Sequence, residues 1–366
     1  MKVLLIILLV SLPVLQICTK LDESNPEDVL NKYLELKNDR DFKAAYELIS
    51  SSSQEFATPG EYVKYYEKPD SLLSKKILVI SVTEIDADKN SPSYKRFKMK
   101  GQEISTKNDT VNYLHYFTLK NEDSRWRIVW DNIIAQQASE SYNKGDYDGA
   151  IKLLETATNL NPFDADAFEK IGWCYTRDET KEYEVRKDKI MTNFKYALSL
   201  EPDDANHYNS MAGYYSFINM PDLAIDSYNK GIDLALSKNE KYSMYANLSA
   251  CYVAKKETDM AIEYLEKAID CYADSPFAWY KYGNLLYDQG KYEGAKEKYE
   301  MALSLPAMEN GLQSGLFYYY SKLCLKQYEY QKSKEYILKA IEMDPNNESY
   351  HDLYQRINNH TSENTY

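Results

Sequence analysis

A repeat of about 34 residues in the second half of the chain most constrains what this sequence can fold into. One alanine-centred segment, residues 145–150, is closely copied at residues 290–295. Equivalent positions recur at intervals of 40, 34, 37, 34 and 38 residues. These landmark positions are Ala150, Ile190, Ala224, Ala261, Ala295 and Ser333. Recurrence at this spacing predicts an array in which each unit stacks on its neighbours.

Further positions recur in phase with these landmarks and indicate what each unit is. A small residue precedes the landmark, at Ala138, Gly172, Ala212, Ser249, Gly283 and Ser321. Seven residues after the landmark another small residue follows, at Ala157, Ala197, Gly231, Ala268, Ala302 and Ala340. Gly145 and Gly290 suit a tight turn, and Pro162, Pro202 and Pro345 suit the end of a helix. Each unit is therefore predicted to be two amphipathic helices that cross at the small residues.

This pattern resembles the tetratricopeptide repeat, over six units spanning residues 132–347. An amphipathic segment with Tyr350, Leu353 and Ile357 on one face is predicted to be a terminal cap helix, within a cap and tail at 348–366. The second unit carries an extra charged stretch, residues 177–187, that should lengthen its helices or form a surface loop. The predicted fold class is therefore mainly α, a solenoid of about six repeats plus a cap helix.

A different domain precedes the array, at residues 24–131. Three short helical segments are predicted, opening at Pro26, Asp41 and Pro59, with the serines at 50–53 as a break between the last two. The hydrophobic period then changes to two, at residues 77–85, 94–104, 111–120 and 126–131. This order predicts an α+β layer in which helices cover one face of an antiparallel sheet while polar residues occupy the other.

The first domain resembles the cone-shaped fold shared by nuclear transport factor and ketosteroid isomerase. The resemblance lies in residues 26–27, 41–46 and the closing segment 126–131. It implies a pocket inside the cone, and some relatives are enzymes. His115 and Tyr113 are the candidate chemical groups on the apolar strand face, and proton transfer would need an acidic partner that this face lacks. We therefore expect His115 to be a packed core residue and the domain to be a spacer or binding module.

The N-terminus has the features of an export signal. One lysine precedes a short apolar run, which predicts a signal peptide over residues 1–18. The segment Leu15–Gln16–Ile17–Cys18 resembles the lipobox of bacterial lipoproteins, although Ile17 stands where that family has a small residue. The resemblance implies a lipid anchor at Cys18 and a location in the bacterial cell envelope. An ordinary signal peptide, giving a secreted or periplasmic protein, is the alternative.

Composition excludes several function classes. The net charge is −13 and no basic stripe is present, which argues against nucleic acid and against adsorption to anionic lipid. The five cysteines and four histidines lie in no metal-binding spacing. No nucleophile elbow, zinc-protease motif or phosphate-binding loop occurs. The sequence therefore predicts a protein that is not an enzyme and needs no metal or cofactor.

The resemblance to tetratricopeptide repeats implies that the first helix of each pair lines a concave groove that binds a protein or peptide. Mapped by phase, the groove-facing candidates are Trp173, Asn209, Tyr280, Asn284, Tyr287, Tyr318 and Lys322. The basic clamp by which some relatives hold acidic chaperone C-termini is missing here, with Lys322 the sole basic residue on that surface. We expect an exported interaction scaffold. The alternative is a small-ligand carrier or a lyase- or isomerase-type enzyme using the first domain.

Overall fold

The computed structural model describes residues 21–67, 77–85, 93–104, 110–306 and 310–363. Inter-residue contacts divide the chain into two compact units, Met1–Met211 and Ala212–Tyr366. The predicted signal peptide and Cys18 lie outside the described residues. Among the described helices, none has both the length and the apolarity that crossing a membrane requires.

The described part of the first unit opens with the helices α1 (Pro26–Asn38), α2 (Phe42–Tyr46), α3 (Ser51–Gln54) and α4 (Pro59–Glu67). The start of α1 is fixed as predicted, because the Asn25 side chain accepts a hydrogen bond from the Glu27 amide and proline opens the helix. The serine break predicted at 50–53 is wrong. Ser50 instead caps α3, and its hydroxyl accepts a hydrogen bond from the Ser53 amide at 3.2 Å.

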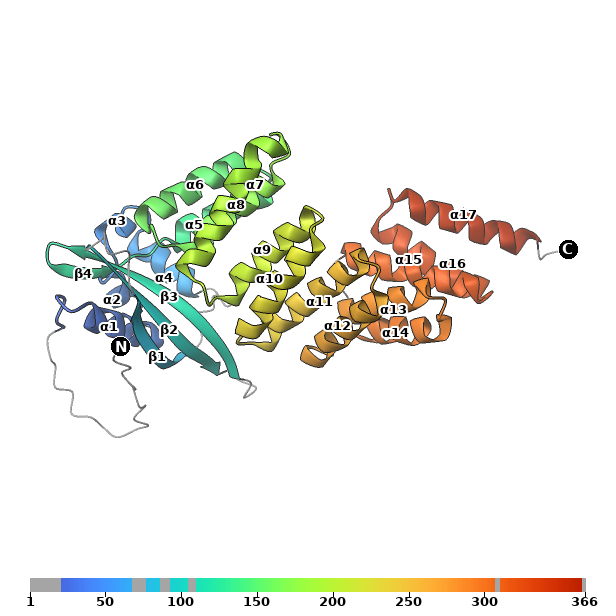
Figure 1. Ribbon diagram of the computed structural model, residues 1–366, viewed down its shortest axis with the longest axis horizontal. Coiled ribbons are helices and arrows are strands. Elements are labelled where there is room, and N and C mark those ends of the chain that lie inside the picture. The colour runs from blue at the N-terminus through green and yellow to red at the C-terminus, as the bar shows by residue number, and fades with distance from the viewer. Residues whose placement is uncertain (1–20, 68–76, 86–92, 105–109, 307–309, 364–366) are drawn as a thin grey trace. The chain divides into compact units, whose positions relative to one another are not determined.

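Four antiparallel strands follow and pair in chain order, as β1 (Ile77–Ile85), β2 (Tyr94–Ile104), β3 (Thr110–Glu122) and β4 (Arg125–Ile128). The predicted α+β layer is confirmed. One sheet face, with Phe97, Met99 and Leu119, packs against Leu30 and Tyr33 of α1. The four strands lie side by side in one sheet (Figure 1). Because side chains alternate between the two faces of a strand, Arg96, Lys98 and Tyr116 lie on the opposite face.

That opposite face is not left to solvent. Arg96 is 4% exposed, and its guanidinium donates to the Leu200 carbonyl at 3.0 Å and to the Glu201 carboxylate at 3.2 Å. Lys98 and Tyr116 both contact the carboxylate of Asp203. The polar face predicted from the alternation therefore packs against the end of a repeat helix, which explains why the first repeats share a compact unit with the sheet.

Twelve helices follow the sheet as six consecutive pairs. They are α5 (Asn132–Asn143) and α6 (Tyr147–Leu160), α7 (Ala165–Arg177) and α8 (Tyr183–Leu200), α9 (Ala205–Phe217) and α10 (Pro221–Leu234), α11 (Lys238–Ala254) and α12 (Thr258–Cys271), α13 (Pro276–Asp288) and α14 (Tyr292–Ser304), and α15 (Asn310–Lys326) and α16 (Tyr330–Met343). The cap helix α17 (Glu348–Glu363) ends the described chain and packs on α16. The extra charged stretch, residues 177–187, forms a short turn and then lengthens the start of α8.

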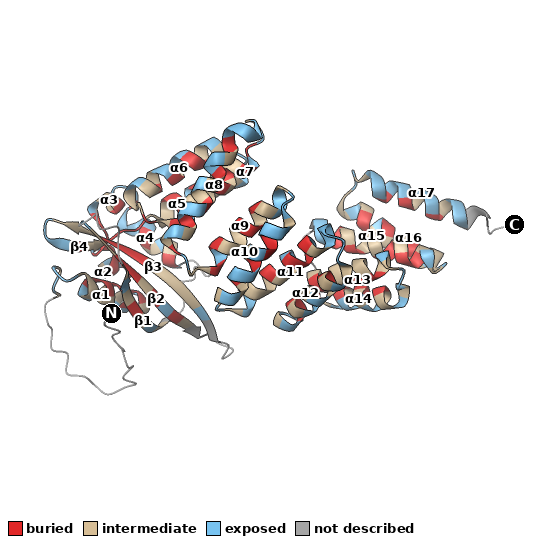
Figure 2. Cartoon of the chain, viewed as in Figure 1, coloured by how far each residue is buried: buried red, intermediate tan, exposed pale blue. Residues whose placement is uncertain are grey.

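The landmark residues occupy the positions that the spacing predicts. All six landmark side chains are fully buried, as are the small residues that precede them, while each helix also carries exposed positions (Figure 2). At Gly283 a Cβ atom would lie 2.4 Å from the Tyr299 ring, so no side chain fits where α13 crosses α14. Gly145 and Gly290 adopt φ of +79° and +73°, the left-handed conformation that ends a first helix.

Candidate functional site

In the second unit, the first helices α13 and α15 lie next to one another, and the cap helix α17 contacts α15. Their facing residues form an aromatic group around one lysine, which we call the Lys322 cluster and define as Tyr287, Tyr318, Tyr319 and Lys322. The Lys322 ammonium lies 5.2, 5.4 and 5.0 Å from the ring centres of Tyr287, Tyr318 and Tyr319. Each of these distances is within the range of a cation–π interaction.

The Lys322 cluster carries a positive charge that its surroundings do not cancel by direct contact. In the described part of the chain, the Lys322 ammonium has contacts with aromatic rings and no ion pair with a carboxylate. A second cation, Arg356 on α17, lies near enough to favour ionisation of Tyr287 and Tyr318. Burial outweighs that effect and raises the pKa of both phenols. All four cluster side chains are half-buried, so each presents a polar tip or a ring edge to solvent.

Three of the seven groove-facing predictions, Tyr287, Tyr318 and Lys322, therefore meet in one place. Tyr319 and Arg356 complete that surface, and the sequence reasoning missed both. The run of three tyrosines at 318–320 was the available signal for Tyr319, whereas nothing in the repeat phase identifies Arg356, because it lies on the cap helix.

The structure corrects the prediction for Tyr280. Its side chain is only 5% exposed and belongs to the core between α13 and α15. Its hydroxyl lies so close to Gly315 that a Cβ there would approach within 2.9 Å. Burial raises the pKa of Tyr280 to about 12. Because Gly315 leaves a space on the neighbouring helix, the ring fills it and is not available to a partner.

Asn284 is half-buried and already engaged, since its side-chain oxygen accepts a hydrogen bond from the Tyr299 hydroxyl at 2.9 Å. The remaining two candidates lie in the first unit. Trp173 packs edge-on against Phe194 and lines a cavity of 410 Å³ with Tyr142. Asn209 is half-buried on α9.

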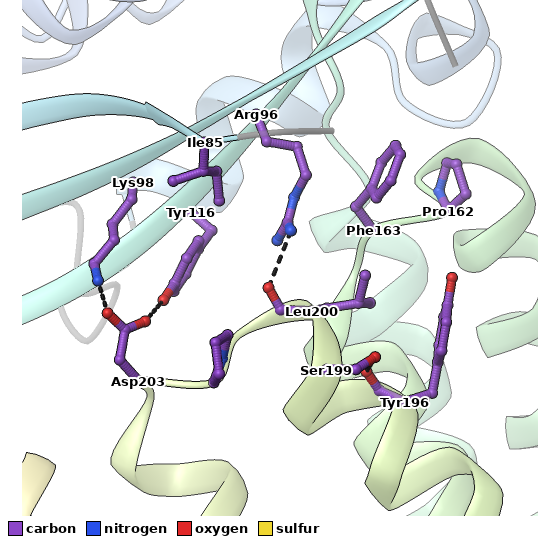
Figure 3. Close-up of a pocket in the computed structure, with 11 residues that line it drawn as sticks. Ile85, Arg96, Lys98, Tyr116, Pro162, Phe163, Tyr196, Ser199, Leu200 and Asp203 are labelled. Carbon is purple, nitrogen blue, oxygen red and sulfur yellow. Dashed lines mark hydrogen bonds and ion pairs between the residues drawn. The ribbon is translucent and has the colours of Figure 1, made fainter. Parts of the chain in front are cut away.

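A larger cavity of 560 Å³ lies in the first unit between the outer sheet face and the repeats. Figure 3 shows Lys98 and Tyr116 converging on Asp203, with Phe163 and Tyr196 on the repeat side. Phe163 is buried, whereas Tyr196 is 43% exposed at the rim. We call this cavity the sheet–repeat pocket, and no feature of the repeat spacing predicts it.

A buried charge network lies behind this pocket. The His207 ring contacts Glu169 through Nδ1 at 2.6 Å and Glu201 through Nε2 at 3.4 Å. Burial opposes the charged ring, but these carboxylates outweigh it and raise the pKa of His207 to about 11. Glu201, Asp204 and His207 are close enough to share a metal ion. Two of these three groups already have partners, because Arg96 pairs with Glu201 and the His207 ring contacts both Glu169 and Glu201.

His115 is half-buried on the sheet face that packs against the helices, near the buried Lys37. Burial, and then the nearby Lys37 charge, lower the pKa of His115 to about 4. Lys37 is itself buried, with its ammonium 3.5 Å from the centre of the Tyr66 ring. His115 therefore faces a cation and packs edge-on against Phe117 at 4.5 Å. In the described part of the chain no carboxylate is hydrogen-bonded to His115, and the charge of Asp166 only partly offsets the lowering of its pKa.

Comparison with known proteins identifies the repeats. Models of the tetratricopeptide repeat match residues 136–182, 242–274, 276–305 and 317–347. Among solved structures, PilF of Pseudomonas aeruginosa is similar at 16% identity, a TM-score of 0.50 and coverage of 62% of this chain and 97% of that chain. PilW, a type IV pilus biogenesis factor, is similar at 20% identity and a TM-score of 0.50, covering 61% of this chain and 97% of its own.

A third similar structure is the APC/C hetero-tetramer Cut9–Hcn1, at 12% identity and a TM-score of 0.50, covering 63% of this chain and 43% of that chain. At these identities the likeness concerns the fold. The repeat models and the solved structures agree with the helix pairs described above. The chain therefore carries tetratricopeptide repeats, in a helical solenoid preceded by a small antiparallel sheet.

Proposed function

We propose that this protein is a non-catalytic scaffold that holds a protein or peptide against the Lys322 cluster. The tetratricopeptide fold itself points to a protein-interaction role. The observation that carries the specific proposal is the lysine with three tyrosine rings within 5.4 Å and no direct carboxylate partner in the described part of the chain. Tyrosine supplies rigid contact area at small entropic cost, and such residues dominate binding energy at interfaces.

Site-specific photo-crosslinking tests the proposal. Tyr287 is replaced by a photoreactive phenylalanine analogue, which preserves an aromatic ring at the cluster. Tyr272, which is 55% exposed at the end of α12, receives the same analogue as a matched control. Irradiation with extract of the source cells should yield an adduct at position 287 that position 272 does not give. Adducts of equal yield at both positions, or at neither, would reject binding at the cluster.

The loss of partner affinity when Lys322 is replaced provides a second test of binding at the cluster. Lys322→Ala should weaken partner binding by about ten-fold or more, as expected of a residue at the centre of an interface. Lys339→Ala is the matched control, because Lys339 also lies over two aromatic rings, Phe317 and Tyr336, but on the second helix of its pair. Equal affinities for the two variants would place the binding surface elsewhere.

We propose that the scaffold is exported and anchored to the cell envelope through a lipid on Cys18. The support is the sequence around Cys18, where the apolar run ends, and a stretch of polar residues begins directly after it. A single lipid chain gives only marginal binding, so a stable anchor requires a multiply acylated cysteine. Mass spectrometry of the N-terminal peptide should find a diacylglyceryl group on Cys18, and Cys18→Ser should release the protein from membranes. An unmodified Cys18 in the membrane fraction would reject the anchor.

A further inference from the structure

We propose that the sheet–repeat pocket binds a small neutral polyhydroxylated ligand, of the saccharide class. The pocket is separate from the Lys322 cluster, and the proposal does not depend on the function proposed above. Its volume of 560 Å³ is in the range of pockets that take small molecules. It lies between the outer face of β2 and β3 and the loop that joins α8 to α9 (Figure 3).

The walls offer apolar surfaces on the repeat side. Phe163 forms a buried wall, and the exposed ring of Tyr196 stands at the rim beside Pro202. The Arg96 guanidinium is held between the rings of Phe163 and Tyr116, 5.4 and 5.6 Å from their centres. Because Arg96 covers those two rings, the exposed ring of Tyr196 is the flat face that suits the C–H face of a pyranose, a ring that is apolar above and below and polar at its edge.

The polar groups offer both hydrogen-bond donors and acceptors. Asp203 accepts from Lys98 and Tyr116, yet each carboxylate oxygen has two lone pairs, so acceptor capacity remains. The Lys98 ammonium has three N–H groups, and its ion pair with Asp203 leaves donors over. The Ser199 hydroxyl donates to the Tyr196 carbonyl at 2.7 Å, so its oxygen remains free to accept. A hydroxyl group, which both donates and accepts, matches this mixture.

Charge decides between a neutral ligand and an ion. The two cations at the pocket are each paired, Arg96 with Glu201 and Lys98 with Asp203. An anion that paired with Arg96 would have to displace Glu201 from a buried ion pair, which is strongly unfavourable. An anion beside Lys98 would lie next to the Asp203 carboxylate, which repels it. A cation would face Arg96 and Lys98. A neutral polar ligand can use the remaining hydrogen-bonding capacity and leave both ion pairs intact.

The Nε–H of Arg96 is a further donor without a partner. It is buried and has no hydrogen-bond acceptor in the described part of the chain, although both terminal nitrogens of the same guanidinium are bonded. A buried donor without a partner is unfavourable, so a ligand hydroxyl that accepted a hydrogen bond from this Nε–H would stabilise the complex. This residue is held rigidly, which favours a preorganised site.

The test is ligand-detected NMR on the protein with a panel of neutral saccharides. The probes are glucose, galactose, mannose, N-acetylglucosamine and their β-linked disaccharides, with glucuronate and glucose 6-phosphate as anionic counterparts. At least one neutral probe should bind, with a dissociation constant of about 1 mM or lower. The anionic counterparts should bind more weakly than the neutral sugar of the same ring. No signal from any neutral probe, or tighter binding of the anions, would overturn the proposal.

Variants locate the binding. Tyr196→Ala should weaken binding about ten-fold through loss of the rim ring. Tyr183→Ala, at the other end of the same helix and also exposed, should leave binding unchanged. Circular dichroism checks that both variants keep the fold. Binding that survives Tyr196→Ala undiminished, or that falls equally in both variants, would place any saccharide outside this pocket and overturn the assignment.

Discussion

Introducing a single methyl group at Gly283 should destabilise the repeat array. The new Cβ atom would lie 2.4 Å from Tyr299 Cε1 and 2.5 Å from Cδ1, well inside contact distance. The Tyr299 ring cannot move away at small cost, because it is fully buried and its hydroxyl is bonded to Asn284 at 2.9 Å. The Tyr299 ring fits at the crossing of α13 and α14 because Gly283 has no side chain there.

The magnitude follows from three opposing contributions. Overpacking a core costs about 1–3 kcal/mol. Displacing the tyrosine also weakens its hydrogen bond, worth about 1 kcal/mol. Replacing glycine by alanine inside a helix returns about 1 kcal/mol through helix propensity. Gly283→Ala should therefore lower the free energy of unfolding by about 1–3 kcal/mol.

Urea denaturation, followed by circular dichroism, measures this change. A double-mutant cycle isolates its cause, because Tyr299→Leu removes the ring that the methyl group meets. In that background Gly283→Ala should stabilise the protein, by about 0.5–1 kcal/mol. A neutral or stabilising effect in the wild-type background, or effects that simply add in the double mutant, would refute the crossing described here.

Three further changes test other parts of the structure. Ser53→Ala removes the hydroxyl that accepts the buried Trp130 amide at 2.9 Å, so thermal unfolding should show a loss of about 1–3 kcal/mol. His207→Gln breaks a buried charge network and should cost about 3–5 kcal/mol. Because the pKa of His207 is raised to about 11, that deficit should be full below about pH 6.5 and should shrink as the pH rises toward 11. Lys37→Met should stabilise the first domain at pH 7, since burial holds the Lys37 pKa well below its usual range. The free energy of unfolding of the wild type should approach that of Lys37→Met as the pH rises toward about 10.4, where the lysine of the unfolded chain also loses its proton. A difference between the two proteins that is constant between pH 7 and 10 would contradict this.

The helix pairs and the sheet could be predicted because their signals are local and periodic. Small residues such as Ala150 and Ala295 recur where two helices cross, and residues 77–85, where the sequence predicts a strand, form β1. The short helix α3 was missed because its start depends on one serine side chain rather than on a period.

The candidate sites were less predictable because they depend on contacts between distant residues. Repeat phase identifies the groove side of a helix, and so it brought Tyr287 and Lys322 together. Repeat phase does not show how closely the next helix approaches. The sequence therefore did not predict that the Tyr280 ring would pack against Gly315 and be buried. The ion pair between Arg96 and Glu201 joins residues 105 apart in sequence, and no spacing pattern links them.

The most direct test of the central claim is the affinity of the crosslinked partner for the protein with and without the lysine of the Lys322 cluster. Once that partner is identified, isothermal titration would compare wild type, Lys322→Ala and the Lys339→Ala control. We predict that Lys322→Ala weakens binding about ten-fold or more while Lys339→Ala binds as tightly as wild type. Affinities for Lys322→Ala and wild type that agree within about two-fold, less than 0.5 kcal/mol, would show that the cluster is not the binding surface.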